Sequence, residues 1–279
     1  MGKPNLVVST EQETQNMLGL KYLLNLLKNK RILNIISILG FLGIWDLLVV
    51  TGTVTLMPRP VEVLQALFEM AVEPLAGKTI FGHVWISFRR VLIAFVIASG
   101  IGIPIGVIMG FNRHAHAIIS PVFEFFKPMP PIAWISLSIL WFGISETSKI
   151  FIIFIGAIVP CIINSFNGIR LVEPELYDCI RNLGAKYSQE HIEVTFPASF
   201  PAIFAGLQVA LSTSWTCVVA AELVGAREGV GFIIIMGMNV DKVAMIIAGM
   251  LVICLVSFAS SLVLVYLERW LCPWKRTLD

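Results

Sequence analysis

Long uncharged apolar runs alternate with short polar segments along this chain. A helix needs about 20 apolar residues to cross the hydrocarbon of a bilayer. Six runs approach or reach that length, and they cover residues 32–51, 91–111, 121–143, 150–169, 199–221 and 243–267. A seventh run, residues 229–240, is too short to span and indicates an external or re-entrant helix. The pattern predicts an all-α polytopic membrane protein with about six transmembrane helices.

The charged residues are few, and their positions indicate the topology. Only 14% of residues are charged and 57% are hydrophobic, which excludes an ordinary soluble protein. The basic residues are spread over loops and the net charge is only +2, so they do not form the basic patch typical of a nucleic-acid-binding protein. Twelve lysines and arginines fall on one side of the predicted topology and seven on the other. The positive-inside rule makes the richer side cytoplasmic, with both termini.

This topology divides the chain into five parts. We expect a cytoplasmic N-terminal segment (1–31), a first transmembrane helix (32–51), an external loop with an amphipathic helix (52–90), a membrane core (91–270) and a cytoplasmic C-terminal tail (271–279).

Two features of the core predict how its helices pack. Gly102, Gly106 and Gly110 recur at four-residue spacing, and such a stripe lets another helix approach closely. The run 121–143 opens with an acid and a base three residues apart, which predicts an ion pair. Three prolines follow and remove backbone donors, so we expect a broken helix that lines a water-filled path. These residues are Glu124, Lys127, Pro128, Pro130 and Pro131.

Polar side chains inside the apolar runs are candidates for lining a solute path. Hydroxyl groups bonded to their own helix or to a neighbouring helix are the alternative interpretation, which stays open. Glu222 has two further interpretations, an ion pair with Arg227 or an interfacial acid. The candidates are Trp134, Ser136, Ser138, Asn164, Ser212, Ser214, Trp215 and Glu222.

The segment 173–201 is a long interior run that a bilayer would reject, because acids, bases and amides recur throughout it. Pro174 suits the first turn of a helix, and Gly184 suits its end. A second short turn is expected before Pro197. The sequence therefore predicts a water-exposed helix between the fourth and fifth spans.

This segment resembles the cytoplasmic coupling motif of ABC import permeases, which reads EAA, three residues, G, nine residues, I, two residues, P. The sequence Asp178-Cys179-Ile180 keeps the acid but replaces the two alanines, and the spacing from Gly184 to Pro197 matches. The run from Lys127 to Gly143 is also similar to permeases of the nitrate, sulfonate and taurine group. The resemblance implies ATPase coupling through Asp178, Leu183, Gly184, Ala185, Lys186, Tyr187, Glu190 and Pro197.

The same resemblance implies the partners and the solute. A type I ABC importer joins two permeases, here most simply a homodimer, with cytoplasmic ATPase subunits and an extracytoplasmic solute-binding protein in the bacterial inner membrane. The solute would be a small organic or inorganic anion, such as a sulfonate, taurine, nitrate or bicarbonate. The chain has no G-x-x-x-x-G-K-[ST] loop, so we expect ATP and Mg on the partner ATPase and no cofactor or catalytic residue here.

Two other classes of function were weighed. A self-sufficient secondary transporter or channel would need intramembrane ionisable groups, and the candidates are only Asp46, Glu124, Lys127 and Glu222. A membrane enzyme would need a catalytic constellation, and none stands at catalytic spacing. The five cysteines lie far apart without a CxxC pair, and the histidines at 83, 114, 116 and 191 fall outside the predicted spans. We expect His114 and His116, which flank an alanine, to be solvated loop histidines, and we expect no metal site.

Overall fold

The computed structural model describes residues 30–54 and 56–274. The chain divides into two compact units, residues 1–64 and 65–279, and each is described by itself. The predictions made for residues 1–29 and 275–279, which include most of the N-terminal segment and much of the tail, lie outside the described residues.

In the first unit, α2 (Lys30–Val50) forms the first expected span. Near its end, Asp46 accepts hydrogen bonds from the Arg59 guanidinium at 2.9 and 3.0 Å. The Trp45 indole N–H donates to the carbonyl of Pro58 at 3.1 Å. The expected amphipathic helix is α3 (Pro60–Val72), and it starts with a proline, whose missing N–H would have no partner there.

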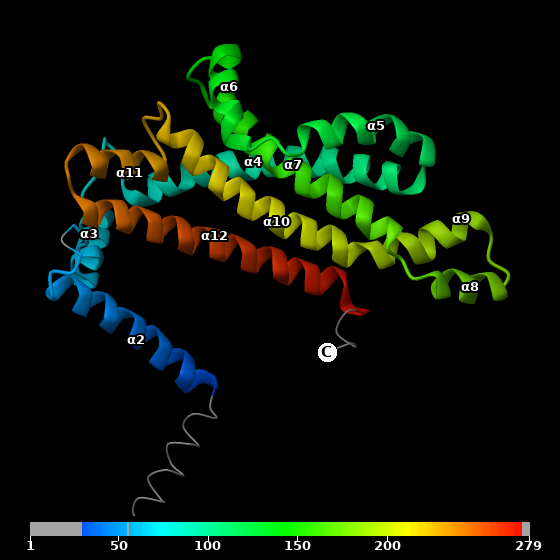
Figure 1. Ribbon diagram of the computed structural model, residues 1–279, viewed down its shortest axis with the longest axis horizontal. Helices are drawn as coiled ribbons and strands as arrows, with labels where there is room; N and C mark the ends of the chain where they lie inside the picture. The colour runs from blue at the N-terminus through cyan, green and yellow to red at the C-terminus, as the bar shows by residue number, and fades with distance from the viewer. Residues whose placement is uncertain (1–29, 55, 275–279) are drawn as a thin grey trace, which may run out of the picture. The chain divides into compact units, whose positions relative to one another are not determined.

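The second unit is built from helices joined by short connections (Figure 1). In chain order they are α4 (Ile80–Phe111), α5 (Arg113–Phe126), the 3₁₀ turn η1 (Pro131–Trp134), α6 (Ile135–Phe142), α7 (Glu146–Arg170), α8 (Pro174–Asn182), α9 (Tyr187–Gln189), the π-helical turn η2 (Glu190–Thr195), α10 (Phe196–Leu223), α11 (Val230–Asn239) and α12 (Val243–Leu271).

Within the described residues, five helices are long and apolar enough to cross a membrane: most of α2, then α4, α7, η2 joined to α10, and α12. The expected third span, 121–143, is not a continuous helix. It is divided into α5, η1 and α6 at the three prolines, which confirms the predicted break. The predicted pair of Glu124 and Lys127 is also present, with 2.8 Å between carboxylate and ammonium.

Helix α4 begins at Ile80, well before the predicted start of the second span at residue 91. The polar residues His83, Ser87 and Arg90 suggested a loop, but all three are buried within this helix. The expectation that His83 lies in the external loop is therefore wrong. Its ring nitrogens contact the backbone carbonyl of Leu75 and the backbone N–H of Gly229, which compensates its burial, and a hydropathy pattern contains no information about such partners.

Helix α7 packs against both α4 and α10, and glycines permit the close approach. A Cβ atom on Gly102 would lie 2.8 Å from the Cβ of Cys161, and one on Gly110 would lie 2.6 Å from the Cβ of Ile169. On the other side of α7, a Cβ on Gly206 would lie 2.5 Å from the Cβ of Asn164. The glycine stripe is confirmed as a packing face.

Candidate functional site

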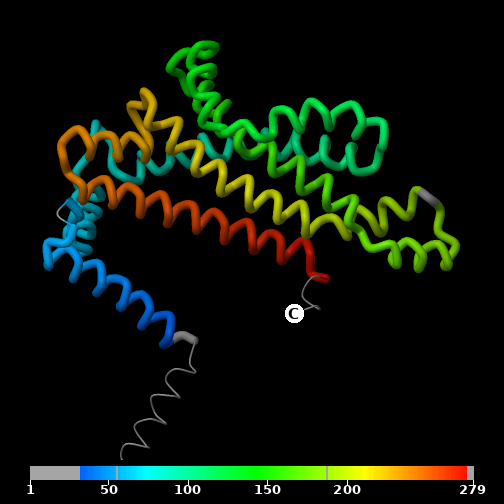
Figure 2. The backbone as a smooth tube through the Cα atoms, in the orientation of Figure 1, coloured from blue at the N-terminus to red at the C-terminus, as the bar shows by residue number. Residues whose placement is uncertain are grey.

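The segment between α7 and α10, residues 171–195, is called the connecting segment here. Figure 2 shows its backbone leaving α7, passing through α8 and returning to α10. Pro174 is the first residue of α8, and the amide of Gly184 donates to the carbonyl of Arg181 just beyond the helix end. Gly184 has φ +83°, a region that glycine enters without steric cost. The predicted helix and its stop are confirmed.

Two side-chain contacts hold α8 against η2. The Arg181 guanidinium donates two hydrogen bonds to the Glu190 carboxylate, at 2.8 and 2.9 Å. The hydrogen bond to Glu190 raises the pKa of Arg181 above its usual value. The Tyr177 and Thr195 hydroxyls lie 2.9 Å apart. Because η2 continues into α10 without a break, these contacts join α8 to a membrane-spanning helix.

Most of the expected coupling residues lie on the outside of this segment. Leu183 is 87% exposed, and Asp178, Gly184 and Lys186 are also exposed. Ala185 is half-buried, and so is Pro197 in the first turn of α10. Glu190 is instead buried in its ion pair, and the side chain of Tyr187 lies outside the described part. Leu183 is the most exposed of the large apolar side chains of this segment, which also include Leu171, Leu176 and Ile192.

A pocket of about 660 Å³ lies among α10, α11 and α12, and it contains two of the candidate path residues, Ser212 and Trp215. The Trp215 side chain is 3% exposed, and its indole N–H has no hydrogen-bond partner among the residues that the structure describes. Ser214 is buried and bonded to the carbonyl of Ala210 at 2.7 Å, so it does not line this pocket. The pocket is thus bordered by a side chain whose buried donor has no partner among the described residues.

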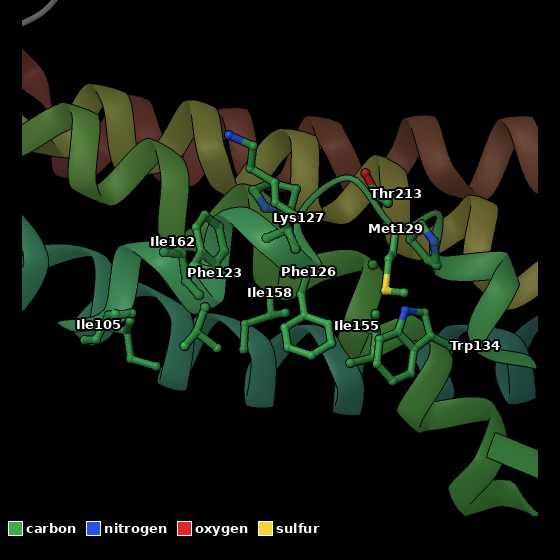
Figure 3. A pocket seen from close by; sticks show the side chains of 16 residues that line it. Ile105, Phe123, Phe126, Lys127, Met129, Trp134, Ile155, Ile158, Ile162 and Thr213 are labelled. Carbon is green, nitrogen blue, oxygen red and sulfur yellow. The ribbon is translucent and has the colours of Figure 1, made fainter. Parts of the chain in front are cut away.

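A second pocket, of about 520 Å³, lies where the broken helix meets α4, α7 and α10 (Figure 3). Trp134 and Met129 line it together with Thr213 of α10, and most of its other lining side chains are apolar. In Figure 3 the Lys127 ammonium points away from these apolar side chains. The pocket is therefore shaped for an apolar group.

The remaining candidate path residues line neither pocket. Ser138 is buried and donates to the carbonyl of Ile135 of its own helix at 2.8 Å, whereas Ser136 is exposed. Asn164 donates to the carbonyl of Pro160 at 2.9 Å. For Ser138 and Ser214, bonding to their own helix, the alternative left open above, is what the structure shows.

A third cluster, called the buried ion network, was not predicted. Arg90 and Glu222 are 2% and 0% exposed, and their Nη1 and Oε1 atoms lie 2.6 Å apart. The Ser87 hydroxyl donates to the same carboxylate at 2.7 Å, and the amide of Gly231 donates to it at 2.8 Å. The interpretation that Glu222 pairs with Arg227 is therefore wrong.

The network continues on two sides of Arg90. Its guanidinium donates to both oxygens of Glu146, at 2.6 and 2.7 Å, and Lys149 donates to Glu146 at 2.9 Å. The Arg90 Nη1 atom also donates to the backbone carbonyl of Glu228 at 2.9 Å. These contacts tie α4 and α7 to the loop between α10 and α11.

Backbone amides at the end of that loop donate hydrogen bonds to side chains of α4. The N–H of Gly229 donates to His83 Nδ1 at 3.1 Å, and the N–H of Val230 donates to Ser87 at 2.9 Å. Gly229 has φ +118°, and a Cβ atom there would collide with the Glu222 carboxylate. The sequence did contain one signal of this network, a base and an acid near the ends of two separate apolar runs. Arg90 and its partner Glu222 lie more than 130 positions apart in the sequence, so only the fold shows that they pair.

None of these clusters offers a metal site. Within residues 30–54 and 56–274, no group of three or more His, Cys, Asp or Glu residues could hold an ion.

Comparison with known proteins gives a consistent result. The family model described as "Binding-protein-dependent transport system inner membrane component" matches residues 102–277. The taurine transport system permease protein TauC of Escherichia coli is 33% identical over 219 residues, covering 78% of this chain and 80% of that protein. The bicarbonate transport system permease protein CmpB of Synechococcus elongatus is 32% identical over 248 residues, covering 86% and 89%.

The fold is similar to a solved structure as well. A chain of the MetNI methionine ABC transporter in inward-facing conformations superposes with a TM-score of 0.57. The two chains are 16% identical, and the match covers 68% of this chain and 94% of that one. At this identity the match establishes a common fold.

Proposed function

The chain belongs to the binding-protein-dependent transport system inner membrane components, the permease subunits of ABC importers, and we propose that its connecting segment receives the movement of a cytoplasmic ATPase. In this proposal the helices carry that movement to a path for a small anion. ATP and Mg are bound by the ATPase partner, and this chain supplies the membrane-spanning part.

The observation that carries the proposal is the exposed Leu183 in a segment too polar for lipid. A leucine that is 87% exposed is unfavourable in water, and burying it in a partner protein is worth about 1.5–3 kcal/mol. Asp178 and Lys186 supply a polar rim around it. The pair of Arg181 and Glu190 keeps α8 fixed to η2, so a push on Leu183 reaches α10.

The rest of the assembly follows from the family. The full importer would contain a second copy of this chain, two ATPase subunits and an extracytoplasmic binding protein, with both termini in the cytoplasm. TauC and CmpB are named for taurine and bicarbonate, which supports a small sulfonate or another small oxyanion as the solute.

The pairing of the intramembrane charges disfavours an ion-coupled carrier. Such a carrier needs an acid or base that changes its charge during transport. The four candidates occur in three ion pairs: Asp46 with Arg59, Glu124 with Lys127, and Glu222 with Arg90. Each of these acids lies within 2.9 Å of a cation, so none of them is a free acid on a path.

The test is uptake by the reconstituted importer with the Leu183→Asp substitution. Proteoliposomes would contain the permease, its ATPase and its binding protein, with radiolabelled taurine and bicarbonate as probes. We expect ATP-dependent uptake to be lost and the ATPase to dissociate from the purified complex. Leu56→Asp is the matched control, because Leu56 is 82% exposed and lies beyond the connecting segment, between α2 and α3. Full uptake by Leu183→Asp would refute the proposal.

A further inference from the structure

A polar pocket of about 700 Å³, called the basic pocket here, lies next to the buried ion network. It is formed by one end of α4, the start of α7 and the loop after α10. Its charged lining residues are Arg89, Arg90, Glu146, Lys149, Arg227 and Glu228.

The basic pocket lies at the far end of the helices from the connecting segment. The pocket includes the first turn of α7, whereas the connecting segment follows its last turn. The 25 residues of α7 place these two ends about 37 Å apart. If the connecting segment meets an ATPase in the cytoplasm, the basic pocket opens toward the outer side of the membrane. The inference therefore depends on the proposed function.

The lining carries an excess of positive charge. Four cations face two carboxylates, which leaves a surplus of two positive charges. The neighbouring groups do not remove this surplus, because Glu222 behind Arg90 and Lys78 beside Glu228 add one charge of each sign. Lys78 also holds the pKa of Glu228 below its usual value through a hydrogen bond, so this carboxylate is already compensated.

Two of the cations are available to a ligand. Glu146 is shared between Arg90 and Lys149, and Glu228 is paired with Lys78 at 2.7 Å. Arg89 and Arg227 are exposed, and neither has an ion-pair partner within the described part of the chain. A guanidinium presents donors in a planar fork that matches the oxygens of a carboxylate, sulfonate or carbonate.

The pocket is also preorganised. Arg227 lies in the loop after α10. Shortly after it, the backbone amides of three consecutive residues, Gly229, Val230 and Gly231, donate hydrogen bonds that hold the backbone in place. Arg89 belongs to helix α4 and directly precedes the buried Arg90. The loop and the helix are thus held in fixed positions at the pocket, and little ordering is required when an anion enters.

We propose that the basic pocket is an outward-facing entry site that holds a small oxyanion between Arg89 and Arg227 before it passes into the membrane path. Its surplus of two positive charges suits an anion of charge −1 or −2. The field of such a pocket raises the local concentration of anions and speeds their capture. An anionic lipid headgroup presents the same oxygen chemistry, so the test must separate the two sources.

The experiment measures binding and uptake with the same variants. Equilibrium binding of radiolabelled methanesulfonate and bicarbonate would be followed with the permease–ATPase complex in nanodiscs of zwitterionic lipid, without the binding protein. We expect Arg89→Gln and Arg227→Gln each to weaken binding about tenfold, the loss of one charge-assisted contact. In proteoliposomes they should raise the KM for uptake and leave kcat nearly unchanged. Arg227→Lys should restore part of the affinity.

Lys242→Gln is the matched control, because Lys242 is an exposed base between α11 and α12 that does not line the pocket. Saturable binding that falls only in the arginine variants would support the entry site. Wild-type uptake driven by ATP, with no saturable binding or with unchanged KM in the arginine variants, would overturn it and leave the proposed function intact. Absence of ATP-dependent uptake by the wild type would instead count against the proposed function.

Two further outcomes identify a different occupant. If anions bind only when anionic lipid is absent, and mass spectrometry finds that lipid lost in the double arginine variant, the pocket is a lipid site. If the variants weaken capture of the empty and the loaded binding protein equally, with unchanged anion affinity, the arginines are a protein-docking surface. Either result overturns the entry site.

Discussion

Replacing Glu222 by leucine tests whether the buried ion network stabilises the fold. The carboxylate accepts hydrogen bonds from Arg90, Ser87 and Gly231, and it is fully buried. Leucine has a similar volume but accepts none of these bonds. The Gly231 amide and one nitrogen of the Arg90 guanidinium would then lose partners that water cannot replace.

The magnitude follows from the burial of both partners. Removing one member of a buried ion pair costs about 3–5 kcal/mol, because the other charge remains without compensation. Arg90 keeps its bonds to Glu146, which places the electrostatic part near the lower limit. The unpaired Gly231 amide adds about 1–3 kcal/mol. We therefore expect a loss of about 4–6 kcal/mol, equivalent to a melting temperature lower by about 8–24 °C.

The assay is thermal unfolding of the detergent-purified protein, followed by loss of the monodisperse peak in size-exclusion chromatography. Glu228→Gln is the matched control, because the side chain of Glu228 is paired at the surface and only its backbone carbonyl contacts Arg90. Its stability should change by less than about 1 kcal/mol. If Glu222→Leu melts within about 2 °C of the wild type, the reasoning from an uncompensated buried charge is refuted.

Three further predictions concern packing, the turn of the connecting segment and the pocket along α10. Gly106→Ala should destabilise the protein by about 1–3 kcal/mol, since its Cβ would lie 2.8 Å from the Cβ of Ser165. Gly100→Ala on the same helix is the control, because a Cβ there meets open space, and it should be neutral in the same melting assay. Gly184→Val should abolish ATP-dependent uptake because φ +83° is strained for a β-branched residue, and Gly184→Asn should retain it; equal uptake by both would contradict this explanation. Trp215→Phe removes a buried donor beside the pocket along α10 that has no partner among the described residues, so the melting temperature should stay level or rise; a large loss of stability would show that the indole has a structural role.

Much of the architecture could be predicted from local pattern. Hydropathy located the spans, and three prolines located the break after α5, because both signals act within a single helix. The turn at Gly184 was also local, since a positive φ favours glycine whatever surrounds it. The face of α4 that packs on α7 was predictable because small residues recur along one stripe.

The site was less predictable, because its polar residues depend on partners distant in sequence. Arg90 suggested a loop because it is charged, but α7 and α10 place two carboxylates beside it within the fold. Ser138 and Ser214 looked like path residues, but their hydroxyls bond to their own helices. In each case the sequence identified an unusual polar group, and only the fold identified its partner.

The unbroken run from Glu190 to Leu223 has a mechanical consequence. Its 34 residues form a rod of about 50 Å with the connecting segment fastened at one end and the basic pocket at the other. Tilting such a rod by about 5° displaces its far tip by roughly 4 Å. If the proposed ATPase moves the connecting segment, this continuous helix would carry the displacement to the loop after α10, with no hinge needed between them.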